Sequence, residues 1–399
     1  MSMQVSVSAF QIDIKEMYLI SNTLVLEMAL EKERVCVTGA GGFLASWVVK
    51  LLLSRDYFVH GTAREPSDEK NARLYELEKA SENLKLFKAD LLDYDSVKSA
   101  IVGCNGVFHI ACPAPSTTME LLEPAVKGTL NVVKACLEAK VKRVIVVSSG
   151  VAVGLNPRWP KGQIMDETCW SDKEYCRTTN NWYCLSKTEA ESEALEFGKK
   201  TGLDVVTICP NLVLGPLLQS KVNTSSLVLI KLLKENSSAA CPVTVGTGVL
   251  QFLNAFLSSN KQFLSSIYTE GYESLENKLR MIVDVRDVAE ALLLAYEKAE
   301  AEGRYICTAH MIRARDLVDK LKSLYPNYNY PKSFTEKEDE VMLTSEKLQK
   351  LGWSYRSLEE TLVDSVESYK KDTSSSSPRI GLNVSVESKP SDKFSANSG

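Results

Sequence analysis

The 399-residue chain lacks the features of several large protein classes. It has only three histidines, and its ten cysteines show no paired spacing of the kind that holds zinc, so we expect no metal site. No apolar run approaches the roughly 20 residues that a membrane-spanning helix needs, and residues 1–30 lack the basic start and cleavage site of a signal peptide. A net charge of −4 spread along the chain gives no footprint for nucleic acid. Cysteines such as Cys36 and Cys209 lie inside apolar runs, which favours a reducing, cytoplasmic environment. We therefore expect neither a membrane nor nucleic acid as a partner; a small molecule is the expected partner on the grounds given below.

Apolar runs alternate with amphipathic segments from residue 31 to 210, in the manner of βαβ units. The run RVIVVSS is almost continuous Val and Ile, which predicts a strand buried on both faces of a parallel sheet. We therefore predict an α/β fold, a Rossmann doubly wound parallel sheet with helices on both faces. Six strands are expected, within residues 34–39, 57–64, 84–90, 106–111, 142–149 and 203–210.

The strict alternation ends after residue 210. Amphipathic patterns over 225–235, 285–299, 313–325 and 357–371 predict a smaller, mostly helical C-terminal substrate lobe spanning residues 211–371. The Ser-rich stretch 372–399 predicts a disordered tail, and residues 1–30 predict a poorly ordered extension.

A glycine-rich turn joins the first strand to the first helix in VCVTGAGGFLASWVVKLLL. Gly39 permits a tight turn, Gly41 and Gly42 let the backbone approach a pyrophosphate, and Ala45 allows close packing of helix on strand. The helix N-terminus then faces the phosphates. We therefore predict a dinucleotide site at Gly39, Ala40, Gly41, Gly42, Phe43, Leu44 and Ala45.

Basic residues follow the second strand, where an NAD enzyme would carry an acid. Arg64 ends the strand in HGTAREPSDEK and Lys70 lies in the loop, and two cations suit the 2′-phosphate of NADP. Glu65 is adjacent, and a solvated basic turn is the alternative interpretation. Asp90 and Leu91 end the third strand and could flank an adenine, although Asp90 could equally cap a helix.

Tyr183 and Lys187 lie one helical turn apart in NNWYCLSKTEAE. Reducing a carbonyl by hydride requires an acid that protonates the new alkoxide, and free tyrosine, with a pKa of roughly 10, is a poor one. An ammonium on the same helical face lowers that pKa. Ser149, at the end of KRVIVVSSG, can hydrogen-bond the substrate carbonyl. The pattern therefore predicts a Ser-Tyr-Lys triad, with a packed tyrosine and a surface lysine as the alternative.

Six motifs together resemble one family: VCVTGAGGFLASW, VFHIACP, KRVIVVSS, NWYCLSK, CPNLVLGP and IVDVRDVAEALL. They resemble the extended short-chain dehydrogenase/reductases, and within these the chain is most similar to the plant cinnamoyl-CoA reductase and cinnamoyl-CoA reductase-like group. The resemblance implies an NADP(H)-dependent oxidoreductase with catalytic Ser149, Tyr183 and Lys187. It implies further cofactor contacts from Ile110, Ala111, Cys112, Pro210, Asn211, Leu212, Val213 and Ser225.

Two departures from the lignin-pathway reductases concern the substrate. Leu185 and Ser186 replace a Tyr-Gly pair, and Val228 stands where those reductases carry a histidine thought to help hold coenzyme A, although Lys231 is retained. Ser149 and Lys231 are the expected substrate-binding residues. The resemblance therefore implies reduction of hydroxycinnamoyl-CoA-type thioesters or of related phenylpropanoid aldehydes and ketones.

Residues 236–270 form an insertion in the lobe, since relatives are expected to run almost directly from Glu235 to Gly271. Because this insertion interrupts the substrate lobe, a second interpretation stays open: an NADP-binding scaffold or sensor that has lost turnover. The resemblance also makes a reversible disulfide between Cys176 and Cys184 conceivable, with two reduced thiols as the alternative.

Overall fold

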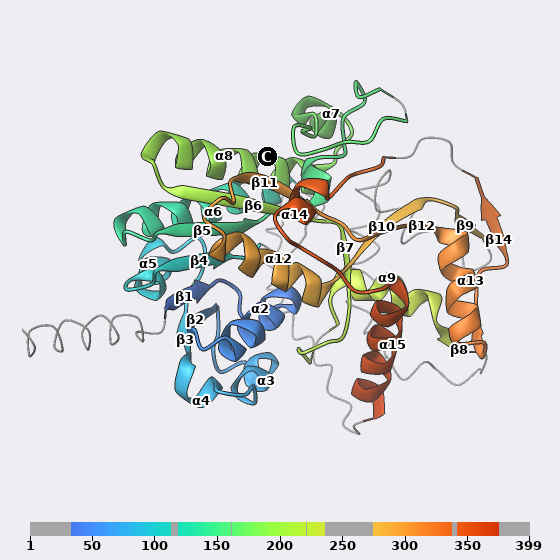
Figure 1. Cartoon of the computed structure of the whole chain (residues 1–399), viewed down its shortest axis with the longest axis horizontal. Helices are drawn as coiled ribbons and strands as arrows, with labels where there is room; N and C mark the ends of the chain where they lie inside the picture. The colour runs from blue at the N-terminus through green and yellow to red at the C-terminus, as the bar shows by residue number, and fades with distance from the viewer. Residues whose placement is uncertain are drawn as a thin grey trace, which may run out of the picture.

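A computed structural model of the protein describes residues 33–112, 119–160, 162–220, 222–235, 274–336 and 341–374. The expected N-terminal extension at 1–30 and the insertion at 236–270 lie outside the described residues. The last helix, α15 (Leu358–Ser374), runs three residues into the segment that we expected to be a disordered tail, and the remainder of that segment is not described. Figure 1 shows a sheet flanked by helices, with a second, smaller lobe beside it.

A seven-stranded parallel sheet forms the larger part of the described chain. Its strand order is β3-β2-β1-β4-β5-β6-β11, so the order reverses between β1 and β4. Ligands of open α/β sheets bind in the crevice outside the carboxyl ends of the strands at such a reversal. The strands are β1 (Arg34–Val37), β2 (Phe58–Ala63), β3 (Leu84–Lys88), β4 (Gly106–His109), β5 (Arg143–Val147), β6 (Asp204–Pro210) and β11 (Gly303–Cys307). The predicted doubly wound fold is confirmed, and the six expected strands are present.

Helices cover both faces of this sheet. On one face α2 (Phe43–Ser54) packs against α12 (Val285–Glu297), and on the other α6 (Leu122–Glu138) packs against α5 (Tyr94–Ile101) and α8 (Trp182–Thr201). Residues along β1 alternate between the two cores, since Val35 and Val37 belong to one apolar cluster and Cys36 to the other. Shorter helical segments are η1 (Glu69–Asn71), α3 (Ala72–Tyr75), α4 (Ala80–Asn83), η2 (Met119–Leu121), η3 (Gly150–Ala152), α7 (Lys173–Thr178) and α14 (Glu346–Lys350).

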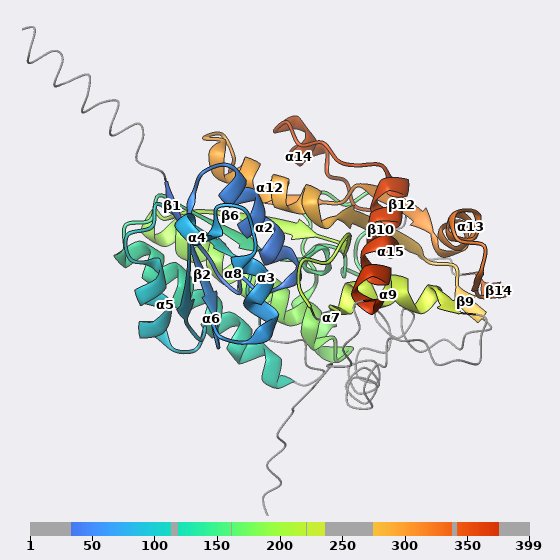
Figure 2. The same cartoon turned by 90° about the horizontal axis from the view of Figure 1, so that it is seen from below.

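The second lobe contains strands as well as the expected helices. A three-stranded sheet runs in the order β12-β10-β7, and two short pairs, β8 with β13 and β9 with β14, lie beside it. The helix α13 lies at the end of the lobe farthest from the main sheet in both views (Figures 1 and 2). The elements are β7 (Leu212–Leu214), α9 (Thr224–Leu232), β8 (Lys234–Glu235), β9 (Ser274–Glu276), β10 (Leu279–Asp284), β12 (His310–Arg313), α13 (Ala314–Leu324), β13 (Tyr328–Asn329) and β14 (Ser333–Thr335).

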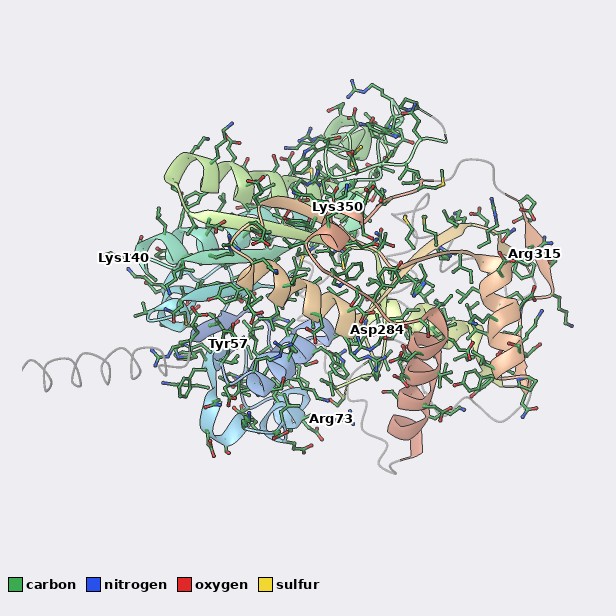
Figure 3. All side chains as sticks on the ribbon, in the orientation of Figure 1. Tyr57, Arg73, Lys140, Asp284, Arg315 and Lys350 are labelled. Carbon is green, nitrogen blue, oxygen red and sulfur yellow. The ribbon has the colours of Figure 1, made fainter. Side chains whose placement is uncertain are left out.

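The chain after residue 210 does not stay in the second lobe. β11 returns to the main sheet as its seventh strand, and α12 packs on α2 within the main core. Periodicity alone cannot assign an amphipathic helix to one of two cores, which is why the sequence placed α12 in the lobe. Asp284 ends β10 and caps α12, and Figure 3 shows it between the two parts. Arg286 joins Asp284 to Asp364 of α15, with N–O distances of 2.8 and 2.6 Å.

Candidate active site

The glycine turn between β1 and α2 leaves a helix N-terminus free to receive an anion. Gly39 has a φ of +69°, which favours glycine, and a Cβ there would lie 3.0 Å from the Cβ of Ala111. Gly42 is the N-cap of α2, and no side chain caps the helix. The first amide groups of α2 are therefore available to an acceptor such as a diphosphate.

Asn71 is a residue of this site that the sequence did not reveal. Its Nδ2 donates to the carbonyl oxygens of Glu65 and Pro66 at 2.9 and 3.3 Å, while its Oδ1 is buried with no hydrogen-bond partner in the structure. A Cβ on Gly41 would lie 2.0 Å from that Oδ1. Asn71 therefore joins the loop after β2 to the glycine turn. The two segments are some 30 residues apart, and no local pattern marks their contact.

Of the two cations predicted to bind the 2′-phosphate, Arg64 is the one whose charge is not paired with a described residue. It is exposed and makes no hydrogen bond or ion pair with the described residues. Glu65, the neighbouring acid, instead pairs with Lys88 at 3.3 Å. Hydrogen bonds from Ser67 and Lys88 hold the pKa of Glu65 below its ordinary value. Lys70 already has a partner, because its Nζ lies 3.4 Å from Asp68 Oδ2.

Asp90 is not a helix cap. Asp93 caps α5 by accepting from the Ser96 amide, whereas Asp90 Oδ1 accepts from the Leu92 amide at 2.9 Å in a local turn. The Asp90 side chain is exposed at the carboxyl end of β3, and the Leu91 carbonyl is held from α6 by Asn131. The helix-cap interpretation is therefore wrong, and a role for Asp90 and Leu91 at the adenine remains a prediction.

The loop after β4 is anchored by a buried threonine and histidine. Thr38 Oγ1 accepts from the amides of Ile110 and Ala111, each at 3.0 Å, so its own proton points to His109 Nδ1 at 3.0 Å. His109 Nε2 then carries the proton and donates to Thr129 at 3.2 Å. Burial, helped by the charge of Lys187, lowers the pKa of His109 to about 3. His109 is therefore neutral and fixes the predicted cofactor contacts Ile110 and Ala111.

The predicted triad comes together at the carboxyl edge of β5. Ser149 follows β5 and caps η3, while Tyr183 and Lys187 lie in the first two turns of α8. The Ser149 side chain interacts with the Tyr183 hydroxyl and acts to lower its pKa. Lys187 Nζ donates to the Val147 carbonyl at 3.3 Å, and the exposed Cys112 is among the groups that raise the pKa of Lys187.

The pKa of Tyr183 is raised, whereas the sequence led us to expect that Lys187 would lower it. Burial raises the pKa of Tyr183, and Lys187 and Ser149 only partly offset this rise. Burial also opposes the charge on Lys187, but the neighbouring Cys112 and Tyr183 favour the ammonium, and its pKa is raised. Tyr183 is consequently protonated and Lys187 charged at neutral pH. That combination suits proton donation to a developing alkoxide.

Asn211 provides an unpaired donor beside this group. Pro210 ends β6, and Asn211 Oδ1 lies 2.1 Å from where a Cβ on Gly150 would stand. Asn211 Nδ2 is buried and has no partner in the described part of the chain. A buried donor without a partner calls for an acceptor from a ligand. Leu212 and Val213 continue into β7.

The remaining predicted contacts lie on α9. Ser225 Oγ accepts from Asn223 Nδ2 at 2.5 Å in the first turn. Lys231 lies in the last turn and is exposed, although partial desolvation lowers its pKa. The role of Lys231 at the substrate stays a prediction.

Cys176 and Cys184 lie in one buried apolar cluster with Leu185. Both are free thiols, and burial raises the pKa of each, that of Cys184 most strongly. The reduced-thiol interpretation describes this structure.

A sequence model of the NAD dependent epimerase/dehydratase family matches residues 35–307. The chain belongs to this family. It is also 40% identical over 341 residues to cinnamoyl-CoA reductase 1 of Petunia hybrida, across 84% of this chain and 92% of the relative. The reductase resemblance inferred from the motifs is therefore confirmed.

Solved structures of family-like reductases share the fold. Vestitone reductase from alfalfa superimposes with a TM-score of 0.67 at 30% identity, covering 85% of this chain and 99% of that protein. A yeast methylglyoxal/isovaleraldehyde reductase complexed with NADPH gives a TM-score of 0.66 at 25% identity, covering 85% and 98%.

Two features are absent from the described residues. None of the helices there is long and apolar enough to span a membrane. Nor does that part of the chain gather three or more His, Cys, Asp or Glu side chains in a group that could hold a metal ion.

Proposed function

We propose that the protein is an NADPH-dependent reductase of hydroxycinnamoyl-CoA-type thioesters or of related phenylpropanoid aldehydes and ketones. One observation carries the proposal: Ser149, Tyr183 and Lys187 come together at the carboxyl edge of the sheet, where Lys187 and Ser149 both lower the pKa of the Tyr183 hydroxyl against the rise that burial causes. The chain's membership of the NAD dependent epimerase/dehydratase family and its similarity to plant cinnamoyl-CoA reductases support it.

The expected cofactor, NADP(H), is confirmed by the family and by the NADPH found in a structural neighbour. The residues present suit it. The uncapped N-terminus of α2 would receive the diphosphate, and Arg64, which has no other partner among the described residues, would receive the 2′-phosphate. Asn211 Nδ2 is a donor for a group near Ser149. Bound NADPH supplies a hydride to the substrate carbonyl.

The side chains then act on the carbonyl oxygen. The Ser149 and Tyr183 hydroxyls hydrogen-bond it, and Tyr183 donates its proton as negative charge develops there. The charged Lys187 stabilises the tyrosinate that remains, and it would hold the ribose of the bound cofactor. On a ketone or aldehyde the reaction stops at the alcohol. On a thioester the hemithioacetal collapses to the aldehyde and free coenzyme A.

The choice between these substrates belongs to the lobe that contains α9. Lys231 is a cation in the last turn of α9 that could meet the phosphates of an acyl-CoA, whereas Val228 is apolar. A catalytically impaired NADP-binding scaffold is the second candidate, and the insertion at 236–270 is the feature that favours it. Cofactor binding without carbonyl-dependent consumption of NADPH would identify the scaffold.

The test is NADPH consumption by the full-length protein with feruloyl-CoA, and in parallel with phenylpropanoid aldehydes and ketones. Tyr183→Phe should lower kcat by about 100- to 10,000-fold, because the general acid is lost. Tyr57→Phe is the matched control, since Tyr57 contacts Glu297 on the surface away from the site (Figure 3). Turnover that survives Tyr183→Phe would refute the assigned role. Absence of turnover with every carbonyl, in a protein that binds NADPH, would favour the scaffold.

A further inference from the structure

A buried ion pair lies directly behind the predicted triad. Glu191 follows Lys187 by one turn on α8, and its side chain is fully buried. Arg304 of β11 grips it with two parallel hydrogen bonds, Nε to Oε1 at 2.7 Å and Nη2 to Oε2 at 3.1 Å. Such bidentate pairs fix orientation as well as distance.

The same carboxylate binds the ends of two further strands. Glu191 Oε2 accepts from Ser148 at 2.6 Å, and Ser148 immediately precedes Ser149. Glu191 Oε1 accepts from Thr207 and Cys209 of β6 at 2.6 and 3.3 Å. One side chain therefore joins α8 to β5, β6 and β11.

Arg304 extends the connection to the loop that follows Ser149. Its Nη1 donates to the carbonyls of Cys169 and Glu167 at 2.6 and 3.2 Å, and its guanidinium stacks 3.4 Å from the ring centre of Trp170. Glu191 and Arg304 therefore contact both sides of the site: the helix that carries Tyr183 and the end of the strand that precedes Ser149.

Geometry connects the pair to the triad. Tyr183, Lys187 and Glu191 are four residues apart in succession, so they share one face of α8. Lys187, Ser148 and Glu191 also line a common cavity of about 20 Å³, which has room for one water molecule. A rotation or slip of α8 that displaced Glu191 would displace Lys187 and Tyr183 with it.

We propose that Glu191 and Arg304 are positioning residues, which set the register of α8 against β5 and thereby the placement of Ser149, Tyr183 and Lys187. This inference rests on the function proposed above. Stability alone gives no reason for the charges, because apolar pairs of similar volume are often as stable as buried ion pairs.

The test compares the double variant Glu191→Leu/Arg304→Met with the parent protein. Removing both partners leaves no unpaired buried charge, so the variant should fold. The readouts are the dissociation constant of NADPH by fluorescence titration, kcat and KM for the carbonyl, and the melting temperature. We expect kcat to fall about 100-fold, because a displacement near 1 Å costs that much. The NADPH dissociation constant should rise about 10-fold through the lost Lys187 contact, with KM for the carbonyl changed less than kcat.

Arg143→Met is the matched control. Arg143 pairs with Asp204 at 2.6 Å across the same two strands, β5 and β6, but at their opposite ends. Lys140, three residues earlier, lies at the margin far from the second lobe in Figure 3. This variant should melt earlier while kcat and NADPH affinity stay within about twofold of the parent.

A folded double variant with kcat and NADPH affinity within about twofold of the parent would overturn the proposal. Arg304→Lys is a second test, because it keeps Glu191 paired with a cation but loses the bidentate geometry. If kcat and the NADPH dissociation constant of this variant equal those of the parent, the positioning role is contradicted. The NADPH titration needs no substrate. If the parent reduces no carbonyl, the proposed function fails, while the effect of the pair on cofactor affinity is still measured.

Discussion

Replacing Gly41 by alanine tests how the cofactor loop is held. Its new Cβ would stand 2.0 Å from Asn71 Oδ1, far inside van der Waals contact. Asn71 must therefore move, and its two hydrogen bonds to the loop carbonyls of Glu65 and Pro66 are lost. Each of these hydrogen bonds contributes about 1 kcal/mol, so re-ordering the loop when NADPH binds should cost about 2 kcal/mol. The expected result is an NADPH dissociation constant raised about 30-fold.

A double-mutant cycle with Asn71→Ala identifies the cause. Asn71→Ala removes the same two hydrogen bonds, so it should weaken NADPH binding by a similar factor. Because the clash needs the Asn71 side chain, Gly41→Ala should cost little more once Asn71 is alanine. Fluorescence titration of all four proteins gives the coupling. Equal losses from Gly41→Ala in both backgrounds would show that the methyl group instead crowds the diphosphate, and the reasoning about Asn71 would be refuted.

Three further predictions use single sites. Arg64→Ala should weaken NADPH binding by about 10- to 100-fold while leaving NADH affinity unchanged, because only NADPH carries the phosphate; equal losses for both would contradict the assignment. The folded-state pKa of His109 is about 3, below its ordinary 6.5, so the unfolded chain binds the extra proton and stability falls as pH drops below 6.5. At pH 5 this amounts to about 2 kcal/mol, and His109→Gln should flatten the urea-unfolding profile between pH 6.5 and 4. Cys176 and Cys184 should resist alkylation in the native protein, since burial raises the pKa of both, and should react as separate thiols after unfolding in non-reducing buffer.

Some of the site could be predicted because it depends on short segments. Gly39 needs a positive φ, and the spacing of Tyr183 and Lys187 places them on one helical face in any α-helix. Ser149 could be placed because the carboxyl ends of parallel strands share one edge of the sheet. These inferences use only the geometry of a turn, a helix and a strand.

Other parts of the site depend on contacts between distant segments. Nothing in the local sequence marks Asn71, whose contact is with Gly41, or Arg304, whose contact with Glu191 spans 113 residues. The pKa of Tyr183 could not be predicted either, because burial, which follows from the packed fold, outweighs the effect of Lys187.

The sequence by itself determined the parallel sheet, the glycine turn and the residues of the predicted triad, because each follows from a periodicity or a spacing within one segment. The tertiary structure decided the return of β11 and α12 to the main core, the strands of the second lobe and the network around Glu191. The physical reason is that packing and buried hydrogen bonds depend on which segments meet. Local patterns do not carry that information.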